Sequence, residues 1–374
     1  MSISMRQSNF KTRILLLGDA SQVHLRRWES YLIQKGYDVF TASLEPIYRF
    51  KGASKRLHVP RLLPDFVRYP MAVPAVGRII RRFRPDVVNA HFVANYGVIA
   101  GMTGFKPWIL STWGSDIMLL PERSPFHMYR TQRVIAAATY ITSDAEVMSR
   151  RLLELGAKRD RVVTFPFGVD RDIFCSSEVV EPGKALRILS NRKLETVYNI
   201  ETIVRAFPSV LKQEAGATLT IAGTGHLAPG LSAMAARTAP AASIHFLGSV
   251  PHQDMAALLQ RHDIYVSMPI SDTTSVSLLE AMACGLFPIV SDIPSNREWI
   301  NHGENGFLVH VADDRGLGEA ITAAWRNVGL RREAARRNHA IIEARADWQK
   351  NMSLFVELIE RTVADAGGRG SPLT

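Results

Sequence analysis

The first half of the chain alternates short apolar runs with segments in which apolar residues recur every three or four positions. The short runs predict buried strands, and the periodic segments predict amphipathic helices. Strands are expected at 13–17, 37–42, 86–91, 108–112 and 139–142. Helices are expected at 23–35, 73–83, 126–137 and 145–155. Between residues 49 and 70, Pro60, Pro64 and Pro70 interrupt any periodicity, and this stretch is predicted to be irregular.

The second half repeats the alternation. Strands are expected at 186–190, 218–222, 244–247, 264–267, 287–290 and 306–310. Helices are expected between them, notably at 200–214 and 276–284, and after about residue 331 the pattern is helical only. Such alternation predicts an α/β chain of parallel sheets with helices on both faces.

Two such sheets in tandem predict two Rossmann-like, doubly wound domains. A polar stretch with Pro182 and Gly183 places the first domain at 1–175 and the second at 176–345. Residues 346–374 are expected to form a C-terminal helix, which has the option of packing back on the first domain, and a frayed tail.

Composition agrees with this size. The 374 residues are 47% hydrophobic and 21% charged, which is ordinary for two globular domains. Two cysteines exclude a disulfide framework and a four-thiolate zinc site, and they indicate a reducing compartment. Residues 1–11 lack the apolar core of a signal peptide. Residues 87–105 carry no charge, but Asn89, His91 and Asn95 favour a buried strand and short helix over a membrane span.

The positive charge is concentrated in the first half. The net charge is +10, yet residues 1–175 hold 26 Lys and Arg against 14 Asp and Glu, whereas the rest holds 19 against 21. A field of this sign attracts nucleic acid, anionic lipid or phosphorylated substrates. An ordinary solvated basic surface is the plain alternative.

Two turns have the position of ligand-binding loops. Parallel sheets bind ligands beyond the carboxyl ends of their strands, where helix N-termini offer free N–H groups. Residues 18–21 follow the first strand, and residues 222–225 follow the strand at 218–222. Neither turn is a full dinucleotide fingerprint or a P-loop.

The densest group of polar residues lies at 271–285. Hydroxyl residues and Asp272 crowd the start of a predicted helix, where unpaired N–H groups suit an anion. Glu280 follows on a helix otherwise made of Leu, Ala and Met, and a carboxylate in that setting needs a partner such as ribose hydroxyls. The structural alternative is capping by Asp272 or Ser275, with Glu280 in a core salt bridge.

Residues 272–285, which end in LLEAMACG, resemble the glutamate-seven-residues-glutamate helix of glycosyltransferase family 4, retaining enzymes of the GT-B fold. Other segments resemble that family in the same order. They are the junction at 165–170, the loop at 219–225, the strand and loop at 244–250, and the closing units at 291–292, Glu298 and 305–307. The resemblance spans about residues 13–330.

The resemblance implies two domains facing a central cleft and the transfer of a sugar from a nucleotide donor. The donor would lie on the second domain and the acceptor on the first, with a UDP-sugar expected ahead of a GDP-sugar. No metal and no cofactor are expected, because basic side chains and helix N-termini would neutralise the diphosphate.

The resemblance also suggests roles for individual residues. Glu280 would hold the ribose, Asp272 the donor sugar and Arg192 the diphosphate, and Asp272, Arg192 and His91 are the expected catalytic residues. The remaining expected donor contacts are Gly18, Lys193, Gly223, Gly248, Val250, Thr273, Thr274, Ser275 and Val276.

Three positions depart from the family pattern. Asp272 is one methylene shorter than the usual Glu. Tyr198 and Asn199 replace a Lys-Gly pair, so Lys193 is the candidate second cation. Trp113 replaces a histidine of the first domain, for which His91 or His24 would substitute.

The basic first domain fits an acceptor on a lipid diphosphate. Polybasic segments are drawn to anionic membranes, and the candidates are 49–68 and Arg78, Arg81, Arg82 and Arg84. The expectation is therefore a cytoplasmic enzyme, peripheral to the inner face of the membrane, that extends a surface polysaccharide or a lipopolysaccharide-type glycolipid. Its partners would be a nucleotide-sugar, a glycan or lipid-linked acceptor and the anionic membrane surface.

Three alternatives stay open. A GT-B enzyme could act on a soluble acceptor. A two-domain Rossmann dehydrogenase would need a full GxGxxG with a later acidic residue, which residues 18–21 do not supply. A nucleic-acid-binding module would need aromatics among the basic residues, and 49–84 offers few.

Overall fold

The computed structural model describes residues 11–60, 62–175, 185–240 and 243–367. The predicted domain junction at 175–184, the N-terminal residues 1–10 and the tail at 368–374 lie outside these ranges, apart from Cys175 itself. The chain forms two compact units. The first contains the described residues up to 144, 148–165 and those from 352 onward, and the second contains 145–147 and 166–351.

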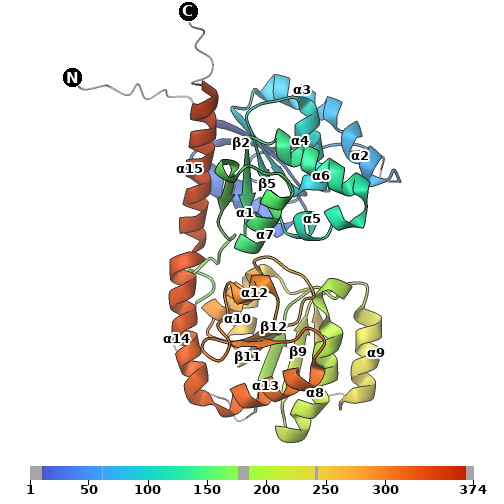
Figure 1. The fold of residues 1–374 in the computed structure, drawn as a ribbon, viewed down its shortest axis with the longest axis vertical. Helices are drawn as coiled ribbons and strands as arrows, with labels where there is room; N and C mark the ends of the chain where they lie inside the picture. The colour runs from blue at the N-terminus through green and yellow to red at the C-terminus, as the bar shows by residue number, and fades with distance from the viewer. Residues whose placement is uncertain (1–10, 61, 176–184, 241–242, 368–374) are drawn as a thin grey trace, which may run out of the picture. The chain divides into compact units, whose positions relative to one another are not determined.

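The first unit is built on a parallel sheet of seven strands in the order β3-β2-β1-β4-β5-β6-β7 (Figure 1). Their bounds are β1 Arg13–Leu17, β2 Asp38–Ser43, β3 Ala53–Arg56, β4 Val87–His91, β5 Trp108–Ser111, β6 Tyr140–Ser143 and β7 Val162–Thr164. Ile14 to Leu17 are fully buried, as expected for a strand covered on both faces. The strand order reverses between β1 and β4, which makes the carboxyl ends of these two strands a ligand-binding position.

Helices cover both faces of this sheet. They are α1 Val23–Gln34, α2 Asp65–Met71, α3 Val73–Phe83, α4 Val98–Thr103, α5 Ser115–Met118, α6 Pro125–Ala137 and α7 Glu146–Glu154. The last helix, α15 (Trp348–Gly367), returns to this unit, where Phe355 packs on Trp28 of α1 with ring centroids 4.2 Å apart. The long red helix beside α1 in Figure 1 is α15.

The prediction that residues 49–70 are irregular was wrong. They contain the edge strand β3 and the helix α2. All four side chains of β3 are exposed, so an apolar pattern could not reveal it, and the strand is held by parallel pairing to β2. Glu29 of α1 is fully buried beside this edge and accepts the backbone N–H of Gly52 at 2.5 Å.

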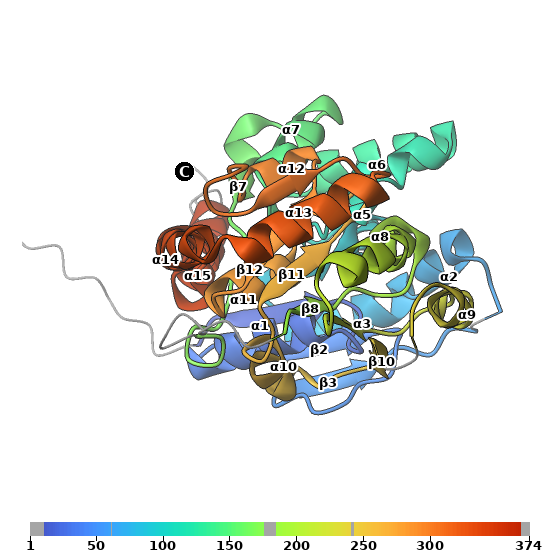
Figure 2. The same cartoon turned by 90° about the horizontal axis from the view of Figure 1, so that it is seen from below.

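The second unit has a parallel sheet of six strands in the order β10-β9-β8-β11-β12-β13 (Figure 2). Their bounds are β8 Arg187–Ser190, β9 Thr218–Ala222, β10 Ile244–Gly248, β11 Ile264–Ser267, β12 Phe287–Ser291 and β13 Phe307–Val309. Alternate residues face two apolar cores, so that Ile188 belongs to one core and its neighbour Leu189 to the other. Here the order reverses between β8 and β11.

The helices of the described chain from α8 onward lie in this unit or begin in it. They are α8 Ile200–Gln213, α9 Ala228–Thr238, α10 His252–Leu259, α11 Val276–Ala283, α12 Pro294–Arg297, α13 Asp314–Arg326, α14 Val328–Arg345 and the start of α15. One core joins the sheet to α8, α9 and α13, and the other joins it to α10, α11 and α14. The predicted parallel sheets with helices on both faces are confirmed. Across the described ranges, no helix has the length and apolar content needed to cross a membrane.

Candidate functional site

The polar residues of the second unit gather where the strand order reverses. Arg192 lies two residues after β8, and residues 271–275 lie between β11 and α11. Parallel strands end at the same edge of a sheet, so the two loops meet. Apart from Gly18, which belongs to the first unit, the residues that the sequence predicts as donor contacts belong to this unit.

Arg192 is the centre of the cluster. Its side chain is 8% exposed, and its Nη2 donates to Asp272 Oδ2 at 2.6 Å. Its Nη1 donates to Ser277 Oγ at 2.9 Å and to Ser275 Oγ. Because Asp272 Oδ1 also accepts the N–H of Thr273 at 3.0 Å, both the guanidinium and the carboxylate are fixed in orientation.

Arg192 stays protonated although its side chain is buried. Burial acts to lower the pKa of Arg192, but the carboxylate of Asp272 outweighs it, and the net effect raises that pKa above its usual range. Tyr198, which replaces the expected lysine, places its ring 4.4 Å from the guanidinium carbon. An aromatic face attracts a cation without adding charge. Lys193 is exposed.

Serine and threonine residues line the start of α11. Ser275 is the N-cap residue, and its Oγ accepts the N–H of Leu278 at 3.3 Å. Thr273 and Thr274 are buried, whereas Val276 is half-buried. The predicted capping by Ser275 therefore occurs, and it leaves other N–H groups of the first turn without partners inside the helix.

Glu280 lies in the second turn of α11 and is 6% exposed. Its Oε1 pairs with His252 Nε2 at 3.2 Å. His252 begins α10, directly after the loop with Gly248 and Val250, so this pair joins that loop to α11. In the described part of the chain Oε2 has no hydrogen bond, and it is the oxygen that a ligand hydroxyl would reach.

Gly223 has a steric reason for being glycine. A Cβ on Gly223 would lie 2.2 Å from the backbone oxygen of Arg192, and one on Gly225 would lie 2.2 Å from that of Leu194. The backbone of the loop after β9 thus packs directly against the backbone of the loop that carries Arg192. Gly248, by contrast, has a φ of +68° and open space around it.

In the first unit, Gly18 follows β1 and His91 is the last residue of β4, the two strands at the reversal point. A Cβ on Gly18 would lie 2.8 Å from the end of the Leu25 side chain and 3.4 Å from His91 Cβ, so a larger residue here would require the Leu25 side chain to shift. Trp113 Nε1 donates to His91 Nδ1 at 3.1 Å. The ring of His24 lies 5.7 Å from that of Trp113, so both candidate histidines adjoin the tryptophan.

His91 is neutral in this setting. Its side chain is 2% exposed, and burial lowers the pKa of His91 to about 3. An indole N–H can only donate, so the accepting Nδ1 carries no proton and the neutral ring carries it on Nε2. Among the described residues, this Nε2 has no hydrogen-bond partner.

Asp116 holds the neighbouring turn. Its Oδ1 accepts the N–H of Trp113 at 3.0 Å, and its Oδ2 accepts that of Val93 at 2.9 Å. Burial raises the pKa of Asp116 to about 6, although these N–H donors oppose the shift. Phe92, between His91 and Val93, has a φ of +73°, a conformation that a bulky residue adopts only under constraint.

Sequence reasoning missed Asp116, His252, Ser277 and Tyr265. Tyr265 donates to Ser277 Oγ at 3.0 Å and so supports the serine that binds Arg192. His252 follows the loop at 248–250 in the sequence, but its pairing with Glu280, 28 positions later, has no local signal. Asp116 lies in the same short segment as Trp113, but nothing in that segment shows that the carboxylate is buried.

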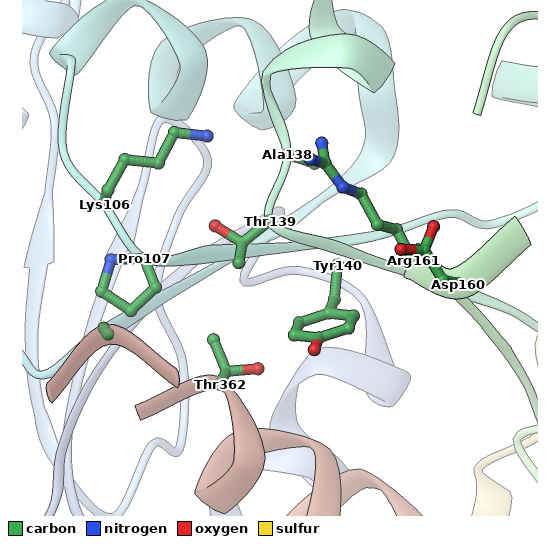
Figure 3. A pocket seen from close by; sticks show the side chains of 9 residues that line it. Lys106, Pro107, Ala138, Thr139, Tyr140, Asp160, Arg161 and Thr362 are labelled. Atoms are coloured by element: carbon green, nitrogen blue, oxygen red, sulfur yellow. The ribbon is translucent and has the colours of Figure 1, made fainter. Parts of the chain in front are cut away.

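Two other features lie apart from these clusters. A cavity of about 530 Å³ lies at the amino ends of β5 and β6, lined by Lys106, Tyr140, Asp160, Arg161 and Thr362 among others (Figure 3). It contains none of the expected site residues. Within the described ranges, no group of three or more His, Cys, Asp or Glu side chains could hold a metal ion.

Comparison with known proteins decides the family. Residues 13–145 match the family described as "Glycosyl transferase 4-like", and residues 174–341 match "Glycosyl transferases group 1". The chain belongs to glycosyltransferase family 4. The predicted resemblance is confirmed, and the two matches fall on the two sheets in turn.

Individual relatives of this family-4 chain are distant. The phosphatidyl-myo-inositol mannosyltransferase of Mycobacterium tuberculosis is 28% identical over 228 residues, which are 59% of each chain. The chain thus matches under two thirds of that relative's length. A sucrose-phosphate synthase from Thermosynechococcus elongatus superposes with a TM-score of 0.84 over 95% of this chain and 100% of its own, at 15% identity.

A third comparison involves a bound nucleotide. The HepE protein of Anabaena, in complex with UDP-glucose, superposes with a TM-score of 0.75 at 15% identity, over 96% of this chain and 99% of its own. At such identities the likeness shows the fold, which is the GT-B fold. The predicted fold class is confirmed to that extent.

Proposed function

We propose that this protein is a retaining glycosyltransferase that moves a sugar from a UDP-sugar to a glycolipid or polysaccharide-precursor acceptor. The observation that carries the proposal is the set of polar residues at α11, where Arg192 binds Asp272 beside the N-terminal turn and Glu280 lies in the second turn. The family supports sugar transfer, and the UDP-glucose complex of the structural neighbour supports the choice of nucleotide.

Each group has a chemical task in this proposal. Glu280 Oε2 accepts a hydrogen bond from a ribose hydroxyl, while His252 holds Oε1. Arg192 and the N–H groups before α11 stabilise the charge that develops on the departing diphosphate, which is the larger part of catalysis in such sites. Asp272, held by Arg192, contacts the donor sugar.

The chemistry of retention and the absence of a metal belong to the proposal as well. With a cation already in place, the leaving group does not require a divalent ion. His91, buried and neutral, acts as a hydrogen-bond donor through Nε2 and not as a general acid. The mannosyltransferase relative, named for a phosphatidylinositol acceptor, supports a lipid acceptor. The proposal includes the location of that acceptor on the cytoplasmic face of a membrane.

The test replaces Glu280 by Gln. A hydrogen bond to a charged acceptor is about twice as strong as one to a neutral acceptor, so we expect about 1 kcal/mol of weaker UDP binding, or roughly a fivefold rise in Kd. Isothermal titration calorimetry with UDP and GDP measures it. Glu319→Gln, an exposed glutamate of α13, is the matched control.

Two results would count against the proposal. Equal UDP affinity in Glu280→Gln and wild type would make Glu280 a structural partner of His252 alone. Failure of every UDP- and GDP-sugar to raise the thermal stability would remove the nucleotide donor, since a ligand at 100 times its Kd stabilises by about 2.7 kcal/mol. Inversion at the anomeric carbon, read by NMR of the product, would refute retention.

A further inference from the structure

Glu280 depends on a single side chain for its orientation. In the part of the chain that the structure describes, its one side-chain hydrogen bond is the 3.2 Å contact between Oε1 and His252 Nε2. Asp272, the carboxylate before α11, is held from two sides, by Arg192 at 2.6 Å and by the N–H of Thr273 at 3.0 Å. The orientation of Glu280 is therefore fixed only as well as His252 itself.

Glu280 lies among apolar neighbours on its own helix. The other residues of α11 from 278 to 283 all belong to one apolar core. A buried carboxylate needs a hydrogen-bond donor, because leaving it unpaired costs a large part of its hydration. A carboxylate only accepts hydrogen bonds, so His252 is the donor and its Nε2 carries the proton. The pair satisfies Oε1 and leaves Oε2 as the acceptor that is not engaged.

His252 is held in turn by the packing of α10 and by an aromatic ring. It is the first residue of α10, directly after Pro251, and Ala256 and Leu259 of this helix are buried in the core that also contains α11 (Figure 2). The ring of Phe174 meets the ring of His252 edge to face, with centroids 5.1 Å apart and planes at 68°. The helix and the ring together restrict the imidazole to one orientation.

Phe174 is itself firmly placed. It is 1% exposed, it belongs to the same core, and its N–H donates to the carbonyl oxygen of Asp170 at 2.8 Å. Phe174, His252 and Glu280 thus form a row in which each side chain contacts the next. Replacing a buried charged pair by apolar residues is often neutral for stability, so stability alone does not account for this row.

We infer that His252 is a positioning residue for the donor ribose. By holding Oε1 it sets the plane of the carboxylate and directs Oε2 to a ribose hydroxyl, so Glu280 needs no ordering when the nucleotide binds. The site then distinguishes a ribonucleotide from a deoxynucleotide, because only a ribose hydroxyl can donate to Oε2. The inference rests on the proposed function for the assignment of Glu280 to the ribose.

The test compares two nucleotides that differ only in the ribose hydroxyls, UDP and 2′,3′-dideoxy-UDP. Isothermal titration calorimetry on the full chain gives the ratio of their dissociation constants. For wild type we expect UDP to bind at least about tenfold more tightly, the usual effect of a hydrogen bond to a charged group. In His252→Ala the Kd for UDP should rise about fivefold, because the carboxylate must then be ordered on binding. The Kd for dideoxy-UDP should stay the same.

Three variants serve as comparisons. His252→Gln can still donate an amide N–H to Glu280, so it should keep most of the ratio. His310→Ala removes an exposed histidine directly after β13 and is the matched control, in which the ratio should equal that of wild type. Glu280→Gln should lower the ratio, and adding His252→Ala to it should lower the ratio no further, because both changes act on one hydrogen bond. Thermal unfolding of each variant checks that it is folded.

Three results would overturn the inference. Equal losses of affinity for both nucleotides in His252→Ala would mean that the histidine supports only the fold of the site. No change in either Kd would mean that Glu280 is oriented without it. Tighter UDP binding by His252→Ala would mean that His252 competes with the ribose for Glu280. Failure of the proposed function looks different, since wild type would then bind neither nucleotide or bind both equally, and the inference would fail with it.

Discussion

The buried His91 makes a quantitative prediction about pH. The unfolded histidine titrates near pH 6.5, whereas the folded pKa is about 3. Above pH 6.5 the ring is neutral in both states and its contribution to stability is fully present. As pH falls below 6.5, His91 binds a proton in the unfolded chain but not in the native state. Stability is therefore lost at about 1.4 kcal/mol per pH unit.

From pH 7 to pH 5 this loss amounts to about 2 kcal/mol. His91→Asn removes it, because the Asn side chain does not titrate while its amide oxygen can still accept the Trp113 N–H. The variant will lose some packing between Trp28 and Trp113, whose rings lie 4.9 and 5.7 Å from that of His91. The lost packing lowers the stability of the variant equally at every pH. The prediction therefore concerns how the difference in unfolding free energy between variant and wild type changes with pH.

Asp116 has the opposite sign and does not obscure the comparison. Its pKa is raised to about 6, so the native state binds a proton that the unfolded state releases, and stability rises as pH falls from about 6 to about 4. Wild type and variant share this contribution. The variant-minus-wild-type free energy of unfolding should therefore shift by about 2 kcal/mol in favour of the variant between pH 7 and pH 5.

The assay must resolve the first unit, because a chain of two units need not unfold in one step. Hydrogen exchange of peptides from β1 and β4, read against urea at pH 5, 6 and 7, does so. His58→Asn, an exposed histidine of the same unit, should follow wild type. The reasoning fails if His91→Asn and wild type lose the same stability between pH 7 and pH 5.

Three further predictions concern the donor loop, metals and the membrane. Gly223→Ala should lower the midpoint of urea unfolding by several tenths molar or more, because the added Cβ would lie 2.2 Å from the Arg192 carbonyl oxygen. The control is Gly230→Ala, a helical position with nothing within 4 Å of the added Cβ, which should be neutral or stabilising by about 0.5–1 kcal/mol. Sugar transfer should persist in EDTA, and loss of turnover restored by manganese would refute a metal-free site. Reversing Arg78, Arg81 and Arg82 to Glu should reduce binding to anionic vesicles and its salt dependence without changing UDP affinity, and unchanged vesicle binding would assign that charge another role.

Much of the fold was predictable because its signal is local. Parallel strands buried on both faces are short apolar runs, and the helices between them repeat at the helical period, so residues such as Ile14 and Ile188 reveal their elements directly. The strand β3 has no such signal, since its four exposed side chains carry no pattern and only pairing with β2 defines it. The burial of Glu29 follows from the same long-range contact.

The residues of the candidate site likewise fall into those that the local sequence indicates and those that it does not. The crowding of hydroxyl and acidic residues before α11 is visible in one stretch of sequence, and it indicated Asp272, Ser275 and Glu280. Their partners come from elsewhere in the chain. His252 reaches Glu280 across 28 positions and Arg192 reaches Asp272 across 80, and tertiary folding alone brings these pairs together.

The return of α15 has a consequence for how the protein is made. The first unit is assembled from both ends of the chain, since Phe355 packs between Trp28 and Phe165, and Tyr37 and Tyr140 donate to Glu360 and Asp365. During synthesis, the strands β1 to β7 leave the ribosome before the whole second unit, and α15 is made only after that unit. Until α15 is made, Trp28 lacks its contact with Phe355, and the nascent first unit exposes an aromatic surface. Such a surface binds chaperones or a second incompletely synthesised chain.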